Sequence, residues 1–144
     1  MLYKITTLTD ELLRLIKDDP VRPEIPVEQR VDANSNIYVL QNDLGEPVAV
    51  TCVKFLADIP TSVEELTDLA VNSTTAVFYT IWSYAAGAGK ELILAARKDI
   101  ETNKPEVKTF VTLSPKTEMA RRFHHKNGAE TYRENADTVN YLYR

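Results

Sequence analysis

The sequence predicts a mixed α/β fold, in which a single twisted, mostly antiparallel mixed sheet carries helices on both faces. Two observations lead to this prediction. Strand-like segments alternate with segments of helical periodicity in the second half of the chain, and strand pairs joined by short turns stand toward both ends. One sheet with helices packed on its faces is the natural arrangement for this order. The whole chain, 1–144, is predicted to form one domain.

The N-terminal part predicts one strand, one helix and an irregular connection. Leu2 to Thr6 alternates weakly between apolar and polar residues, which favours a short strand. A helix is expected from Asp10 onward, because apolar residues recur on one face until the Asp-Asp-Pro sequence that ends at Pro20. Three prolines between 20 and 26 then predict a surface connection without regular structure.

The segments 36–40 and 47–55 predict a β-hairpin. Both are rich in β-branched and aromatic residues, and Asp43 and Gly45 supply the turn between them. Cys52 lies within the second of these strands. We therefore expect it to be a small buried apolar residue rather than a nucleophile.

The remainder of the chain predicts strands separated by helices. In the last helix we expect Met119, Ala120 and Phe123 to point inward, because they recur at helical spacing. The expected elements are a short helix from a Thr61-x-x-Glu64 capping box to about Leu69, a helix that follows Gly89 and ends at Asn103, a helix at 116–126, and strands at 76–82, 107–113, 130–133 and 138–143.

The segment from Ala76 to Arg97 carries the clearest functional signal. An apolar strand, a turn with Gly87 and Gly89, and a helix follow one another directly. The first N–H groups of a helix have no partner within the helix, and its dipole adds partial positive charge, so this unit can bind a phosphate or pyrophosphate. Neither the P-loop motif nor the dinucleotide-binding motif GxGxxG is present.

Composition limits the classes of partner. The net charge of −4 and the isoelectric point near 5.2 argue against nucleic acid and against an anionic membrane surface. A single cysteine and two adjacent histidines argue against a metal centre, and the lone cysteine fits a reducing compartment. No apolar run reaches the roughly eighteen residues of a membrane span. We expect a cytoplasmic protein without a metal.

Two motifs resemble the GNAT acyltransferase family. The sequence Tyr84-Ala-Ala-Gly-Ala-Gly89 resembles the Q/R-x-x-G-x-G/A turn that cradles the pyrophosphate of coenzyme A in that family, with Tyr84 in place of Gln or Arg. The segment 116–129 resembles a second GNAT motif, in which Ala120, Phe123, Lys126 and Gly128 are in register. His124 stands where many members have a tyrosine that protonates the departing thiolate. The resemblance implies a GNAT-like fold and an acyl-CoA partner.

Within this superfamily the chain resembles the malonyl-CoA decarboxylases. Short runs between Glu46 and Tyr143 are similar in the same order, and Phe123-His124 with Asn127-Gly-Ala resembles an F-H-x-x-N-G-A motif whose histidine is catalytic. The F-Y-S-I-S region with the family's catalytic serine is altered here, since Thr80 and Trp82 replace the two serines. That family's N-terminal helical domain is also missing from this sequence.

The resemblance implies roles for particular residues. His124 would be the catalytic acid or would act on an enolate, assisted by Ser83 or Thr80, and N–H groups near Ile81 and Trp82 would face the thioester oxygen. The large indole of Trp82 would favour a small acyl group such as acetyl. The residues expected to contact coenzyme A are Ile81, Trp82, Tyr84, Ala85, Ala86, Gly87, Ala88, Gly89, Lys90 and Ser114.

Three functions remain open from the sequence. Acyl transfer from acetyl-CoA to an amine of unknown identity is placed first, and decarboxylation of malonyl-CoA through His124 is the alternative. A non-catalytic domain that binds coenzyme A or has a structural role is the third, supported by Tyr84 and by the lack of a clear acidic base. Glu64, Glu65 and Asp68 are the possible bases. The family resemblance also leaves a homodimer open.

Overall fold

A single mixed sheet organises the chain, of which the computed structural model describes residues 1–68 and 72–144. Its strand order is β1-β2-β3-β4-β5-β8-β6, and β7 pairs with β8. Neighbouring strands are antiparallel except for β4 and β5, which are parallel. The strands are β1 (Leu2–Ile5), β2 (Ser35–Gln41), β3 (Pro47–Leu56), β4 (Thr75–Ser83), β5 (Thr109–Thr112), β6 (Ser114–Pro115), β7 (Glu130–Glu134) and β8 (Thr138–Tyr143).

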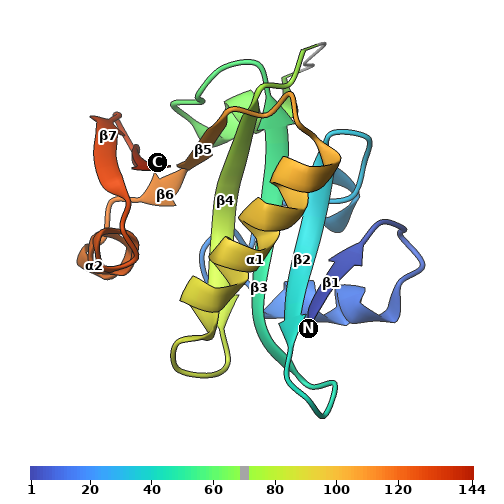
Figure 1. Cartoon of the computed structure of the whole chain (residues 1–144). Helices are drawn as coiled ribbons and strands as arrows, with labels where there is room; N and C mark the ends of the chain where they lie inside the picture. The colour runs from blue at the N-terminus through green and yellow to red at the C-terminus, as the bar shows by residue number, and fades with distance from the viewer. Residues whose placement is uncertain (69–71) are drawn as a thin grey trace.

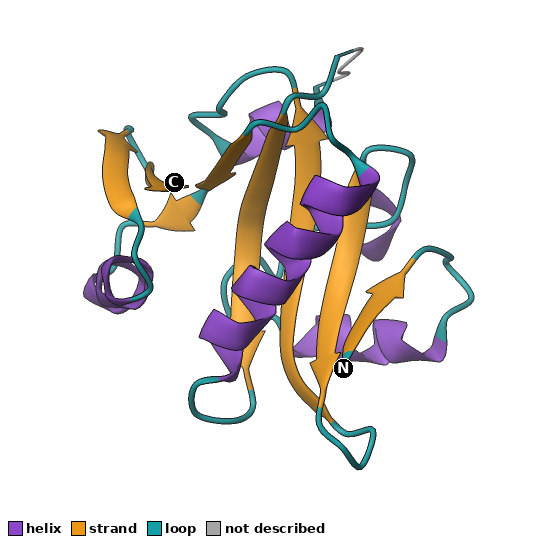
Figure 2. Ribbon diagram, in the orientation of Figure 1, coloured by secondary structure: helices purple, strands orange, loops and turns teal. Residues whose placement is uncertain are grey.

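Helices lie on both faces of this sheet. Figures 1 and 2 show α1 lying across the central strands, with the first 3₁₀ helix behind the sheet and α2 standing beside β6 and β7. The predicted mixed fold is therefore confirmed, including all the strands expected from the sequence; the two-residue strand β6 was not expected. The helices are α1 (Ala88–Asn103) and α2 (Glu118–Lys126), with 3₁₀ helices at Glu11–Asp18, Val27–Gln29 and Val63–Thr67.

Two apolar cores form, one on each face of the central strands. On one face Leu92, Ala96 and Ile100 of α1 pack in a cluster with Phe55 and other strand residues. The opposite face packs against the N-terminal segment. Because the central strands are buried on both faces, their sequences are almost continuous runs of apolar residues.

A β-bulge interrupts the pairing of β3 with β4. Cys52 is paired with Thr80, but the next residue, Val53, is paired with Phe78, so Tyr79 is an extra residue in β4. A bulge of this kind bends the strand and redirects the side chains that follow it.

Just past this point β4 and β5 separate. Their parallel pairing ends where Phe78 meets Thr112, and the last bond between them runs from the N–H of Leu113 to the carbonyl of Phe78, at 3.1 Å. β6 then pairs with β8 instead. In the described ranges, no strand pairs with this edge of β4 after Phe78. The result is a V-shaped opening within the sheet.

The N-terminal half departs from prediction in two respects. The expected first helix is a 3₁₀ helix, which Asp10 caps by accepting a hydrogen bond from the N–H of Leu12. The proline-rich connection is not wholly on the surface, because Arg22 and Ile25 are buried, as is Asp19 just before it. Asp19 pairs with Arg30, and the guanidinium of Arg22 donates to the carbonyl of Leu113, contacts that the composition of the segment does not reveal.

Two details of the later helices were also predicted wrongly. Glu65, not Glu64, caps the short helix, since its carboxylate accepts from the N–H of Ser62 at 2.8 Å. The expected end of this helix at Leu69 lies outside the described residues. Met119 is 81% exposed, because α2 stands at the side of the sheet and turns only the Phe123 and His124 side toward the core.

Candidate active site

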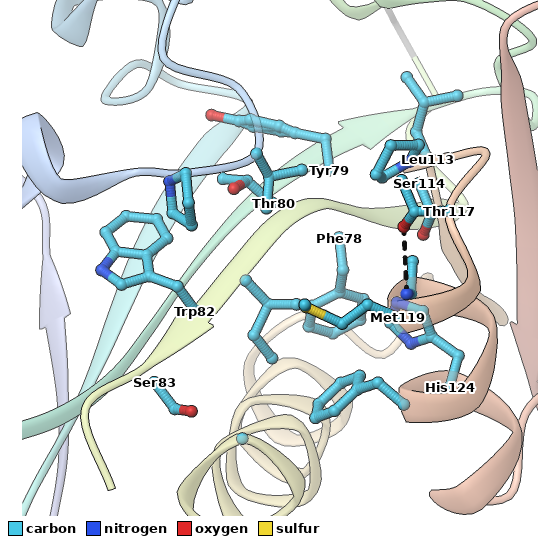
Figure 3. A pocket seen from close by; sticks show the side chains of 17 residues that line it. Phe78, Tyr79, Thr80, Trp82, Ser83, Leu113, Ser114, Thr117, Met119 and His124 are labelled. Atoms are coloured by element: carbon cyan, nitrogen blue, oxygen red, sulfur yellow. Dashed lines mark hydrogen bonds between the residues drawn. The ribbon is translucent and has the colours of Figure 1, made fainter.

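A cavity of about 340 Å³ occupies the opening between β4 and β5. Figure 3 shows its walls, and we call this cavity the cleft. It is bounded by β4 from Phe78 to Ser83, by residues 113–115, by Gly89 of α1, by one side of α2 with its N-cap, and by Pro20 and Val21. The sequence predicted the walls from β4, Ser114, α1 and α2 but not the wall from the N-terminal segment.

The exposed edge of β4 offers a backbone N–H to the cleft. Tyr84 donates its N–H to the carbonyl of Val48 in β3, at 2.8 Å. Because N–H groups alternate in direction along a strand, the N–H of Trp82 also faces β3 and that of Ile81 faces the open edge. The sequence analysis expected N–H donors near Ile81 and Trp82, and the strand register makes Ile81 the one that can donate into the cleft.

The turn at the start of α1 needs glycine at two positions, for two different reasons. Gly87 has φ of 78°, the left-handed conformation that side chains disfavour. Gly89 is close to another element instead, since a Cβ there would lie 2.8 Å from Cε1 of Phe123. Ala85, Ala86 and Lys90 are exposed around the turn, whereas Ala88 is buried. The helix therefore begins at an accessible turn beside the cleft.

Trp82 and Tyr84 are tied to the N-terminal segment. The Trp82 indole donates to the Tyr84 hydroxyl at 3.0 Å, and that hydroxyl donates to Asp18 at 2.8 Å. The side chain of Tyr84 is thus directed away from the glycine turn, where the family motif has Gln or Arg. Trp82 lines the cleft while 92% of its surface is buried, on the side opposite His124 in Figure 3.

His124 lies in the α2 wall of the cleft. Its side chain is buried, and Nδ1 is 2.6 Å from the hydroxyl of Tyr143 in β8. The imidazole also stacks on Tyr141, with ring centroids 5.1 Å apart. Burial, with a smaller effect of the neighbouring His125, lowers the pKa of His124 from 6.5 to about 4. The imidazole is therefore neutral at pH 7 and held in one orientation.

This pKa predicts that the protein loses stability in mild acid. Between pH 6.5 and pH 4 the unfolded chain binds a proton at His124 that the folded chain does not, so the folded state is penalised as the pH falls. The expected loss at pH 5 relative to pH 7 is about 2 kcal/mol from this group. Urea unfolding at both pH values should show this loss in the wild type and in His125→Gln. An equally large loss in His124→Gln would contradict the assignment.

In the described residues, the hydroxyls predicted as catalytic, Thr80 and Ser83, and that of Ser114, predicted to contact coenzyme A, are not hydrogen-bonded to His124. Thr80 is buried and donates to the carboxylate of Asp19 at 2.7 Å, and Ser83 is exposed at the end of β4. Ser114 donates to the hydroxyl of Thr112 at 2.8 Å. All three line the cleft, but no hydrogen bond joins any of them to the imidazole in the described part of the chain.

A buried ion pair supports the bulge from behind. Asp19 and Arg30 have fully buried side chains and are 2.7 Å apart, and the carboxylate also accepts from Thr80. The guanidinium of Arg30 donates further to the carbonyls of Arg22 and Ile25. This ion pair was not predicted from the sequence, because charged residues are usually exposed and no local motif marks Asp19 or Arg30.

The described lining of the cleft contains no acidic side chain. Glu64, Glu65 and Asp68, the bases considered from the sequence, do not line it. Glu65 and Asp68 border a second, smaller cavity of about 170 Å³ near Pro60. His124 and the hydroxyl groups of the serine, threonine and tyrosine residues are thus the titratable or hydroxyl side chains in the described lining.

The opening between β4 and β5, beside a glycine turn and helix α1, defines the class as the GNAT fold. No family model matches the chain. Arabidopsis thaliana NAA60 in complex with acetyl-CoA superposes with a TM-score of 0.68 over 99% of this chain and 97% of that one, at 13% identity. At this identity the likeness concerns the fold.

The chain also resembles malonyl-CoA decarboxylases in sequence. The mitochondrial enzyme of the goose Anser anser anser is 28% identical over 124 residues, covering 73% of this chain and 25% of the goose protein. The Agrobacterium vitis enzyme is 26% identical, with a TM-score of 0.70 over 85% of this chain and 35% of that one. The resemblance to both groups is thus confirmed. The chain spans about a quarter to a third of these two relatives.

One further observation concerns membranes. Among the helices of the described ranges, none is both long enough and apolar enough to cross a bilayer.

Proposed function

We propose that the chain is an enzyme that binds an acyl-CoA thioester in the cleft and acts on its acyl group. One observation carries this proposal: an unpaired edge of β4 runs from the glycine turn to the buried imidazole of His124. A pantetheine arm needs such an edge for its amide groups, and a pyrophosphate needs a helix N-terminus. Both requirements are met along one continuous wall.

The expected binding mode assigns each part of the thioester to a wall of the cleft. The pyrophosphate would lie at residues 86–90, where the turn and the first turn of α1 are accessible and Lys90 is exposed. The thioester oxygen would accept from the N–H of Ile81. Removing one such preorganised donor typically costs about 3 to 4 kcal/mol of transition-state stabilisation.

The geometry at His124 favours decarboxylation of a malonyl thioester. If the Tyr143 hydroxyl donates to Nδ1, the proton of the neutral imidazole is on Nε2. The bond between Cα and the carboxylate breaks, carbon dioxide leaves, and the electron pair forms an enolate whose oxygen accepts from Nε2–H and Ile81. A proton from water then reaches Cα and gives acetyl-CoA, and the remaining hydroxide combines with the released carbon dioxide as bicarbonate. A neutral, apolar cleft suits this step because no acidic base is needed.

Acyl transfer to an amine is the second candidate. It is supported by the structural similarity to NAA60 in complex with acetyl-CoA, which this chain matches over 97% of the length of NAA60. An ammonium acceptor must lose a proton, and no acidic group among the described residues lines the cleft to accept it. The acceptor, a homodimer and a cytoplasmic location stay predictions from the sequence.

The binding half of the proposal can be tested at the glycine turn. Ala86→Glu places a carboxylate on the exposed turn, where it should repel the pyrophosphate and weaken binding of acetyl-CoA and malonyl-CoA by at least about tenfold. The matched control is Ala136→Glu, on the exposed turn between β7 and β8. Calorimetric titration provides the dissociation constants. Equal affinities in both variants would overturn the proposed phosphate site.

The reaction is tested with malonyl-CoA alone. Release of carbon dioxide and formation of acetyl-CoA, in a protein that binds the thioester, would support decarboxylation. If malonyl-CoA stays intact while acetyl-CoA is consumed in the presence of amines, acyl transfer is the function instead. Absence of thioester binding would refute both.

A further inference from the structure

A four-residue segment crosses the opening between β4 and β5. We call residues Asp19 to Arg22 the strap. At one end Asp19 accepts from the hydroxyl of Thr80 in β4, at 2.7 Å. At the other end Arg22 donates to the carbonyl of Leu113, just past β5, at 3.1 Å. Pro20 and Val21, between these anchors, line the cleft. The strap is thus bonded to both sides of the V.

The strap is held rigidly from behind. The Asp19 carboxylate accepts from the N–H groups of Val21 and Arg22, at 2.7 and 3.0 Å, and is paired with Arg30. The guanidinium of Arg30 in turn donates to the carbonyl of Arg22, at 2.6 Å. Because these groups are buried, breaking the bonds would leave charges and donors without partners. The position of Val21 is therefore fixed by the network.

The anchors place the strap at the narrow end of the cleft. β4 and β5 are still joined at Phe78 and Leu113, and the strap is bonded to Thr80 and Leu113 beside that junction. The glycine turn lies at the other end of β4, after Ser83. A thioester bound with its phosphates at the turn would point its acyl group toward the strap.

We propose that the strap is the end wall of the acyl site and that Val21 limits the length of the acyl group. This inference rests on the proposed function, because it assumes that a thioester occupies the cleft. At the centre of the strap, Pro20 and Val21 line the cleft, and the isopropyl group of Val21 is half-buried. The same wall restricts approach by a second substrate from the N-terminal face. A decarboxylase needs no such substrate.

The test compares acyl chain lengths in two variants of one residue. Val21→Ala should lengthen the acyl site, and it should raise the affinity for butyryl-CoA relative to acetyl-CoA by about tenfold, the discrimination expected for one or two methylenes. Val21→Phe should weaken binding of both thioesters and leave binding of free coenzyme A unchanged. Val27→Ala, also half-buried but away from the cleft, is the matched control and should keep the wild-type ratio.

Calorimetric titration with coenzyme A, acetyl-CoA and butyryl-CoA separates the possible failures. If coenzyme A and acetyl-CoA bind, but Val21→Ala keeps the wild-type butyryl-to-acetyl ratio and Val21→Phe binds both thioesters as tightly as the wild type, the strap is not the acyl wall and the proposed function stands. If no thioester binds to the wild type, the proposed function fails and this inference fails with it. Circular dichroism identifies a variant that does not fold, and the other Val21 variant then decides.

Discussion

Replacing Asp19 by alanine is expected to lower the free energy of unfolding by about 3 to 5 kcal/mol. The substitution leaves the guanidinium of Arg30 buried with no carboxylate beside it, and it removes the acceptor for Thr80 and for two backbone N–H groups. Such a loss is a large part of the stability of a domain of this size. Urea unfolding, followed by circular dichroism, measures the change.

The control for Asp19→Ala is Glu118→Ala, which removes an exposed carboxylate that pairs with Arg121 and Arg122 on the surface of α2. Exposed pairs of this kind contribute about 0 to 1 kcal/mol. A loss below about 1 kcal/mol for Asp19→Ala, equal to that of the control, would mean that the buried pair does not hold the N-terminal segment on the sheet. The double replacement of Asp19 by Ala and Arg30 by Met should recover part of the lost stability, because it also removes the unpaired charge.

Replacing His124 by glutamine is expected to reduce kcat on malonyl-CoA by about 10² to 10⁴, with a small change in KM. Glutamine keeps a polar group in the α2 wall but cannot reproduce the imidazole held by Tyr143 and stacked on Tyr141. Steady-state production of acetyl-CoA measures the effect. The neighbouring exposed His125 provides the matched control, since His125→Gln should retain nearly full kcat.

A second variant tests whether the orientation of the imidazole, and not only its presence, contributes to kcat. Tyr143→Phe leaves His124 in place but removes the hydroxyl that fixes its tautomer, so kcat should fall by less than in His124→Gln while KM is retained. If His124→Gln turns over malonyl-CoA at the wild-type rate, the imidazole has no part in the reaction. The proposed role of His124 in decarboxylation would then have to be abandoned.

The strands were predictable because their apolar runs reflect burial on both faces of the sheet. Val39 and Val50 pack on one face, and Tyr38 and Phe55 on the other, so the β-branched and aromatic composition of these runs indicated strands. The glycine turn was also readable, since Gly87 adopts a backbone conformation that few other residues accept. These signals are local, and each depends on a few consecutive residues.

The remaining features depend on contacts between distant segments. The bulge at Tyr79 has no glycine or proline to mark it, and it exists only in the pairing of β4 with β3. The bond between His124 and Tyr143 joins α2 to the last strand, which no sequence period links. Asp19 and Arg30 are buried although charged residues are usually exposed, so the composition of these segments wrongly indicated an exposed position for both.

The contact of Gly89 with Phe123 joins two parts of the cleft that the sequence presents as separate motifs. The backbone of α1 approaches the edge of this aromatic ring so closely that a single methyl group would displace it. Phe123 is covalently adjacent to His124 and packs edge-on against its imidazole, with ring centroids 5.0 Å apart. We therefore expect a shift of the first turn of α1 to move the Phe123 ring, and with it the imidazole of His124. Positions 89 and 123 therefore constrain each other, so a larger residue at position 89 is expected to displace the side chain next to His124.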